Sequence, residues 1–232
     1  MANSTKMVVD MSVVFAISGL LFLLEDFANA REWISIGAEA RGATAVVGGS
    51  IVAVGVVFAR GGSLLDLGFR RPEHWARVPF QVIGILAAFI AVQTLAPLLI
   101  SSFITVPEPD MSRYASIAGN LGNAITMAIV LPLAAAIPEE IIYRGFLMGR
   151  LSEIFGNNLR GASMTVLVQG LIFSSVHFQW GLGGMMLTFI MGIVWGAAYL
   201  MSGRNLWIVI LAHSAGHILL VVQLYLAKPL AI

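Results

Sequence analysis

The sequence predicts an all-α bundle of transmembrane helices, and we expect residues 1–232 to form a single transmembrane domain. Hydrophobic residues make up 59% of the chain and charged residues only 11%, whereas a soluble domain carries about 25% charged residues. The apolar residues gather in long runs that polar stretches separate. A membrane-spanning helix needs roughly 20 mainly apolar residues, and several of these runs approach that length.

The apolar runs predict about seven spans, within a range of roughly six to eight. The predicted spans are 8–24, 44–59, 80–104, 121–137, 162–178, 183–201 and 206–227. The first run follows a terminus with one lysine and no small-residue cleavage pattern, so we interpret it as a retained helix rather than a signal peptide. The second run is short and rich in glycine ("VVGGSIVAVGVVFA"), which favours close packing against a neighbouring helix.

Lysine and arginine predict the orientation, because they are enriched in the cytoplasmic connections of membrane proteins. If the N-terminus is cytoplasmic, the inner connections hold Lys6, Arg60, Arg70, Arg71, Arg77, Arg150, Arg160 and Arg204. The outer connections then hold Arg31, Arg41, Arg113 and Lys228. The excess on the inside predicts a multi-pass protein of the cell membrane with its N-terminus in the cytoplasm.

Charge and cysteine content exclude several classes of function. The net charge of +1 gives no indication of a nucleic-acid partner. The chain has no cysteine, so disulfides, thiolate metal sites and a cysteine nucleophile are excluded. The partner that the sequence does predict is the lipid bilayer around the helices.

Ionisable residues lie in three otherwise apolar stretches, "IPEEIIYRGF", "FSSVHF" and "AHSAGH". Such residues are costly within a membrane and usually mark a functional site. Glu140 and Arg144 are four residues apart, so on a helix they share a face and can form an ion pair. Glu139 points about 100° away from Glu140, so one carboxylate can be neutralised while the other stays free for chemistry.

Pro138 either begins a helix at these glutamates or kinks a longer helix. We expect the longer helix, running through Pro138 to about Gly149, because a helix that ended at residue 137 would leave Glu139 at the membrane surface. His177 lies deeper in its predicted span than the other ionisable groups. This difference in depth argues against a single site that includes His177.

His213 and His217 are also four residues apart and share a helix face. Together with His177 and Glu139 they fit two chemistries. In the first, Glu139 is a general base, His177 helps to hold a water, and His213 and His217 donate hydrogen bonds to an oxyanion. In the second, the three histidines bind Zn²⁺ and Glu139 activates the metal-bound water. Both chemistries hydrolyse an acyl bond such as a peptide bond.

The three stretches resemble the motifs of the CAAX-protease and bacteriocin-processing family of intramembrane endopeptidases, also called the CPBP or Abi family. "EEIIYR" matches its E-E-x-x-x-R motif, "FSSVH" matches F-x-x-x-H, and "HSAGH" matches H-x-x-x-N or a variant of it. The motifs occur in the family's order. The resemblance is strongest over residues 139–217 and extends more loosely over 64–217, which we take as the family core.

The resemblance implies that Glu139 activates a water with His177 as its partner and that His213 lies on the oxyanion side. It also implies that Glu140 and Arg144 are an orienting, structural pair. His217 departs from the family pattern, in which asparagine is common; a histidine can still donate a hydrogen bond, and it also suits a metal. We favour a metal-free mechanism without a cofactor, and Zn²⁺ bound by His177, His213 and His217 is the alternative.

The resemblance therefore implies an intramembrane endopeptidase that cuts a membrane-associated peptide or protein, with a site open to the cytoplasm. The prenylated CAAX substrate is not carried over to this chain. The alternatives are a non-catalytic membrane scaffold or bacteriocin-immunity-type protein, and a proton-coupled transporter. The intact set of Glu139, His177 and His213 favours the enzyme, and the lack of an internal sequence repeat disfavours the transporter.

Overall fold

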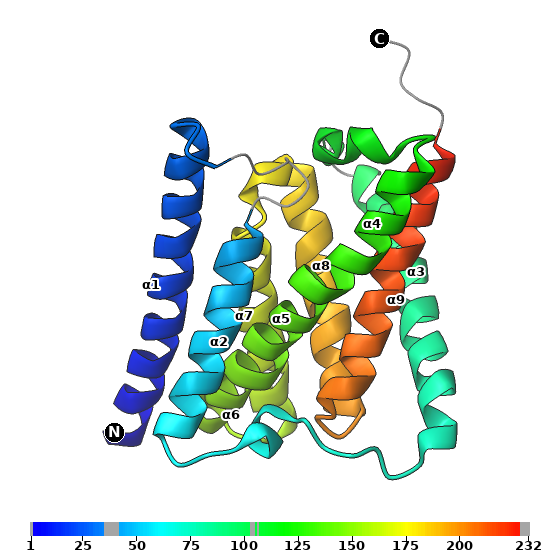
Figure 1. The fold of residues 1–232 in the computed structure, drawn as a ribbon. Helices are drawn as coiled ribbons and strands as arrows, with labels where there is room; N and C mark the ends of the chain where they lie inside the picture. Colours follow the sequence, from blue (N-terminus) through cyan, green and yellow to red (C-terminus); the bar gives the residue numbers. More distant parts are fainter. Residues whose placement is uncertain (1, 35–41, 103–104, 106, 228–232) are drawn as a thin grey trace.

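The computed structural model describes residues 2–34, 42–102, 105 and 107–227, and these residues form a bundle of helices without a strand (Figure 1). Its long helices are α1 (Ala2–Ala30), α2 (Ala43–Ala59), α3 (Val78–Ser101), a composite helix over Leu121–Phe155, α7 (Leu159–Ser175), α8 (Gly181–Met201) and α9 (Leu206–Leu226). Short 3₁₀ turns lie in the connections, at Leu64–Leu67, Trp75–Arg77, Ser112–Ile117 and Phe178–Trp180. The predicted all-α fold is confirmed.

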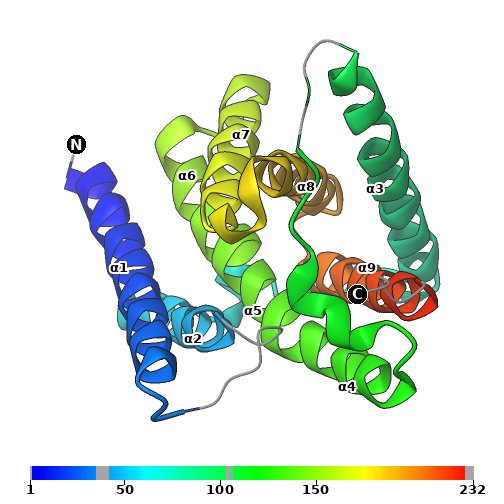
Figure 2. The same cartoon turned by 90° about the horizontal axis from the view of Figure 1, so that it is seen from above.

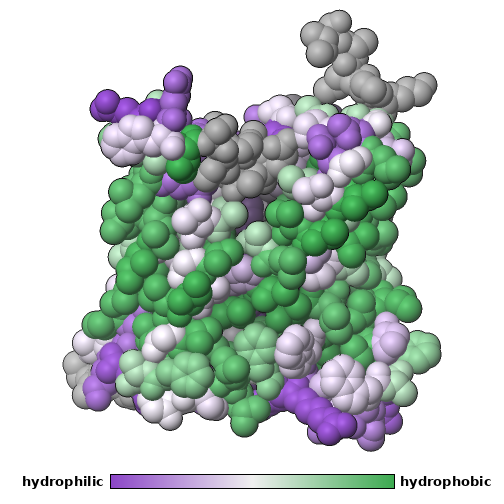
Figure 3. Space-filling model, viewed as in Figure 1, coloured by the Kyte–Doolittle hydropathy of each residue, from purple (hydrophilic) through white to green (hydrophobic). Residues whose placement is uncertain are grey.

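Most of the long helices have the length and composition of membrane spans. Five helices are long and apolar enough to cross a membrane: Ser4–Ala30, Trp75–Ser101, Leu121–Phe155, Phe178–Met201 and Leu206–Leu226. Helix α2 is apolar but shorter. Apolar residues form a belt at mid-height on the face shown in Figure 3, and hydrophilic residues gather at its two ends. The chain is therefore a multi-pass membrane protein, and the count of about seven spans, which includes α2 and α7, stays a prediction.

Successive long helices run in opposite directions, so their connections alternate between the two ends of the bundle (Figure 1). We call the end with the N-terminus the N-side; it also holds the α2–α3 and α8–α9 connections and the connection from the composite helix to α7. The other end, the C-side, holds the α1–α2 and α7–α8 connections and the end of α9. The cations assigned above to the cytoplasm therefore share the N-side. Of the cations assigned to the opposite side, Arg41 and Lys228 lie outside the described residues.

The composite helix carries the two glutamates in its interior. It consists of α4 (Leu121–Leu131), α5 (Ile137–Glu139) and α6 (Met148–Phe155), with π-helical segments at Pro132–Ala136 and Glu140–Leu147 between them. A proline cannot donate a backbone hydrogen bond, and this helix contains both Pro132 and Pro138. Wider π-helical turns occur frequently at functional sites. The helix continues past residue 137 to Phe155, so the expected long helix through Pro138 is confirmed.

Glycines allow α2 to pack closely on α1, as its composition predicted. A Cβ atom on Gly48 would collide with the Leu21 side chain, and one on Gly49 would collide with Ser18. Seen from above, α1 and α3 lie at opposite edges of the bundle, with the composite helix, α7 and α8 between them (Figure 2). Two ionisable residues of the composite helix, Glu140 and Arg144, are fully buried in the bundle.

Candidate active site

Glu140 and Arg144 form the ion pair expected from their spacing. Arg144 Nη1 donates to Glu140 Oε1 over 2.9 Å, and both side chains are 0% exposed. The guanidinium also lies over the ring of Phe173 on α7, 4.9 Å from its centroid. A buried ion pair needs such additional partners, because burial removes the water that would otherwise solvate both charges.

His213 on α9 contacts the same carboxylate oxygen. Its Nδ1 lies 2.7 Å from Glu140 Oε1. A carboxylate paired with an arginine is ionised and can only accept, so Nδ1 of His213 must be the donor. Nε2 of neutral His213 is then an acceptor; it is buried without a hydrogen-bond partner and lies 3.9 Å from Glu139 Oε2. His213 can donate from Nε2 only when it carries a second proton.

A cavity of about 360 Å³ lies next to Glu139, between α1, α2, the composite helix and the α7–α8 turn. Its lining is mainly apolar and aromatic, with Phe22, Ile142 and Trp180 among its members. Among the described residues that line it, Glu139 is the only acidic side chain and His177 the only histidine. The Glu139 side chain is 12% exposed, whereas Glu140 is fully buried. The two adjacent carboxylates thus have different surroundings. Glu140 is buried behind the cavity wall, and Glu139 lies on the surface of the cavity.

His177 lies beyond the end of α7 rather than within it. The predicted span 162–178 ends as a helix at Ser175, and His177 begins the 3₁₀ turn Phe178–Trp180. Its Nδ1 lies 2.7 Å from the carbonyl oxygen of Phe173. Because a carbonyl only accepts, Nδ1 carries the proton and Nε2 of the neutral ring is an acceptor. The expectation that the helix of the predicted span 162–178 includes His177 was wrong, since this helix ends at Ser175.

His217 lies one helical turn from His213 on α9. The two imidazole rings are 4.6 Å apart between centroids. Nδ1 of His217 is buried and has no hydrogen-bond partner in the described part of the chain. Neither His213 nor His217 is among the described residues that line the cavity, and His213 approaches the site through its Nε2, 3.9 Å from Glu139 Oε2.

The candidate residues therefore form two groups that meet at Glu139. One group is Glu139 with His177 on the cavity, and the other is Glu140, Arg144, His213 and His217 in the bundle interior. Among the described residues, no three or more side chains of His, Cys, Asp or Glu are grouped closely enough to hold a metal ion. The three histidines proposed as zinc ligands are thus not gathered into one ligand set.

Two features of the cavity were not found from the sequence. Tyr143 packs edge-on against Phe173, with centroids 4.9 Å apart, and it also lines the cavity. Arg113 and Tyr114 line the cavity as well, from the 3₁₀ turn Ser112–Ile117. They lie in a polar connection without a motif, so no sequence signal distinguished them from other loop residues.

The cavity is reached from the C-side of the bundle. Its outer lining residues include Gly42 before α2 and the exposed Phe178 and Gln179 in the α7–α8 turn. The sequence analysis expected both a cytoplasmic N-terminus and a site open to the cytoplasm. The two expectations are incompatible in this fold, because the N-terminus and the cavity lie at opposite ends.

Fold and site together define a multi-pass membrane protein with buried carboxylates and histidines beside an apolar cavity. Residues 121–219 match the family model described as Type II CAAX prenyl endopeptidase Rce1-like. The matched region contains all three motifs, so the resemblance to the CAAX-protease family is confirmed for residues 121–219. Comparison with curated proteins and with solved structures finds no match.

The family supports a membrane-embedded endopeptidase in general terms. The match begins at α4 and ends in α9. The extension of the family core back to residue 64, and the treatment of residues 1–232 as one domain, stay predictions.

Proposed function

We propose that the chain is an intramembrane endopeptidase in which Glu139 activates a water for attack on a peptide bond. The observation that carries this proposal is the position of Glu139, the one carboxylate among the described residues of an otherwise mainly apolar cavity, with His177 on the same cavity. An apolar surrounding excludes bulk water and strengthens the electrostatic effect of each polar group within it. Glu139 is also not bound to Arg144, so its charge is available to accept a proton.

His177 is proposed to hold the attacking water. Its Nδ1 proton is engaged by the Phe173 carbonyl, which leaves Nε2 to accept a hydrogen bond from the water. Glu139 takes a proton from this water while the oxygen of the water adds to the carbonyl carbon of the peptide bond. Glu139 then delivers that proton to the leaving nitrogen as the C–N bond breaks.

His213 is proposed to stabilise the oxyanion from Nε2, in its doubly protonated form. Glu140 accepts from Nδ1 and so holds the ring with Nε2 near Glu139. With Glu139 and Glu140 ionised, Arg144 and the imidazolium balance the two negative charges. His217 supports the same side of the site through its contact with the His213 ring. No step requires a metal, and Zn²⁺ remains the alternative that a chelator tests.

The substrate is proposed to be a membrane-associated peptide or protein. The mainly apolar lining favours apolar or aromatic side chains around the cut bond. The matched family is described as a CAAX prenyl endopeptidase, so a prenylated CAAX peptide belongs among the substrates to be tried.

The test is cleavage of a membrane-peptide library by the purified protein in lipid vesicles. Glu139→Gln removes the base and His177→Ala removes the acceptor for the water; each is expected to lower kcat by about 10²–10⁴-fold. Asp26→Asn, a change at an exposed carboxylate on α1, is the matched control and is expected to cleave normally. Activity lost with a chelator and restored by Zn²⁺ would replace the metal-free mechanism. Full activity of Glu139→Gln would overturn the proposal, and no cleavage by the wild type across the library would favour the scaffold or immunity function.

A further inference from the structure

A second cavity, of about 490 Å³, lies at the N-side of the bundle, the opposite end from the candidate active site. It is bordered by the start of α1, the end of α2, the turn Leu64–Leu67, α6 and the α8–α9 turn. Its ionisable lining residues are Lys6, Arg60, Arg70, Arg150 and Arg204, with Asp10, Asp66 and Glu153. Five cations against three carboxylates leave an excess of positive charge in this cavity.

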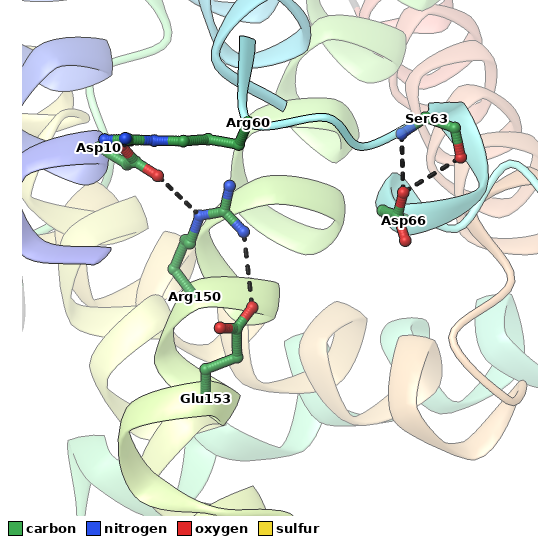
Figure 4. A network of polar contacts seen from close by, with 6 residues as sticks. All are labelled: Asp10, Arg60, Ser63, Asp66, Arg150 and Glu153. Carbon is green, nitrogen blue, oxygen red and sulfur yellow. Dashed lines mark hydrogen bonds and ion pairs between the residues drawn. The ribbon is translucent and has the colours of Figure 1, made fainter. Parts of the chain in front are cut away.

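The three carboxylates are already engaged (Figure 4). Asp10 accepts from Arg60 Nε at 3.1 Å and Nη2 at 2.6 Å, and it also lies 3.4 Å from Arg150 Nε. Glu153 pairs with Arg150 at 3.5 Å. Asp66 accepts from the backbone and side chain of Ser63, and these hydrogen bonds hold the pKa of Asp66 below its usual value. Asp10 and Glu153 therefore neutralise Arg60 and Arg150, and Asp66 caps a turn.

Three cations form no ion pair with a carboxylate among the described residues, although the charge of Arg70 acts on nearby Asp66. Lys6 is exposed at the cavity, and Arg70 donates from Nε only to the Leu65 carbonyl at 3.3 Å. Arg204 Nη2 donates to two neutral groups, Ser152 Oγ at 3.0 Å and Asn157 Oδ1 at 2.8 Å. These three cations converge on one cavity from α1, the α2–α3 connection and the α8–α9 turn, so the charge excess is local.

One of these cations, Arg204, has an uncommon backbone conformation. Arg204 has a φ of 58°, in the left-handed region that a side chain other than glycine rarely adopts. Such conformations cost on the order of 1–3 kcal/mol and persist where the surrounding structure or a function requires them. The strained residue here is one whose guanidinium reaches the cavity wall.

Part of the remaining lining is apolar, beside the polar Ser152 and Asn157. Met7, Val57, Leu67 and Phe146 contribute to the cavity beside the charged groups. The cavity also lies at the end of the helices, where the headgroups of a bilayer meet the spans. Basic pockets between transmembrane helices at this level bind the head groups of anionic lipids.

We infer that this cavity binds the phosphate group of an anionic phospholipid from the leaflet on the N-side. The phosphate oxygens accept hydrogen bonds from Lys6, Arg70 and Arg204. Charge-assisted bonds from arginine and lysine to phosphate are strong and directional. Arg60 and Arg150, held by Asp10, form the fixed wall of the site. A neutral lipid lacks the net charge that the unmatched cations require.

The test uses the whole protein in nanodiscs of phosphatidylcholine with increasing phosphatidylglycerol, and it measures lipid binding by energy transfer to a labelled phosphatidylglycerol. The paired change Arg70→Gln with Arg204→Gln is expected to weaken binding about tenfold or more. The control is Arg71→Gln with Arg160→Gln, which removes two exposed charges from the same end but outside the cavity. Equal losses in both pairs would show only general attraction to the charged surface and would overturn the inference.

Two further arms complete the design. Lys6→Gln changes an exposed side chain near the start of α1, so it tests the same site if the arginine pair unfolds the protein; an unchanged affinity in this variant would contradict the inference. Inorganic phosphate at millimolar concentration distinguishes the source of the ligand. No competition by free phosphate supports a lipid, whereas full competition with no preference for the labelled lipid would assign the site to free phosphate.

Discussion

Glu140 and His213 meet at 2.7 Å although they are far apart in the sequence. The contact joins the interior of the composite helix to α9. It fixes the imidazole by its Nδ1 and directs its Nε2 to within 3.9 Å of Glu139. The buried carboxylate thus acts on the candidate site through the histidine, while Arg144 compensates its charge.

Glu140→Gln is expected to lower kcat with little change in KM. The substitution keeps the volume of the side chain and removes the charged acceptor that holds Nδ1 of His213. Loss of one oxyanion donor typically costs about 10²–10³-fold in kcat, and we expect a loss of that order. The measurement is steady-state cleavage of the best library peptide.

A double-mutant cycle with His213→Gln separates this role from a purely structural one. If Glu140 acts through His213, the double variant is no slower than His213→Gln alone, because the two changes remove one interaction. Losses in kcat that multiply independently would contradict the coupling. A folded state equal to the wild type by circular dichroism is required of each variant.

Arg144→Met is expected to destabilise the fold by about 3–5 kcal/mol, because it leaves the buried charge of Glu140 without its partner. The matched control is Arg160→Met, at an exposed arginine at the start of α7, and its effect should lie within about 0.5 kcal/mol. Unfolding by denaturant in mixed micelles gives both values. Equal stability of Arg144→Met and the control would show that the ion pair contributes nothing to the fold.

The sequence predicted the features that depend on residues close together in the chain. Composition and run length predicted the helical bundle, and the spacing of Glu140 and Arg144 predicted their pairing. The glycines of the second apolar run predicted a close contact with a neighbouring helix, and the structure shows that this neighbour is α1. Each of these follows from local geometry, in which helix periodicity decides which side chains meet.

Long-range features could not be predicted in this way. No spacing rule places His213 on the oxygen that also binds Arg144, since the contact depends on how α9 packs against the composite helix. The end of α7 before His177 was also missed, because no glycine or proline follows Ser175 until Gly181. The contribution of α1 and α2 to the cavity depends on the packing of the whole bundle.

Gly192→Ala is expected to destabilise the contact between α7 and α8 by about 1–3 kcal/mol, as overpacking of a close contact does. A Cβ on Gly192 would lie 2.8 Å from Gly170 Cα, a backbone atom that can move only with its helix. Gly84→Ala on α3 is the control, because nothing lies within 4 Å of its added Cβ. It should be neutral or slightly stabilising, since alanine favours a helix more than glycine does. Thermal unfolding of the two variants side by side decides the matter, and a stable Gly192→Ala would contradict the close approach.

The side of the membrane from which the cavity opens can be measured directly, because the chain has no cysteine. Gln179→Cys places a thiol at the outer cavity wall on the C-side, and Glu73→Cys places one in the α2–α3 connection on the N-side. The excess of cations at the N-side predicts that this side is cytoplasmic. A membrane-impermeant maleimide should therefore label Gln179→Cys in intact cells and Glu73→Cys only after permeabilisation. The reverse pattern would place the N-terminus outside and open the cavity to the cytoplasm, and it would show that the charge distribution does not determine the orientation of this chain.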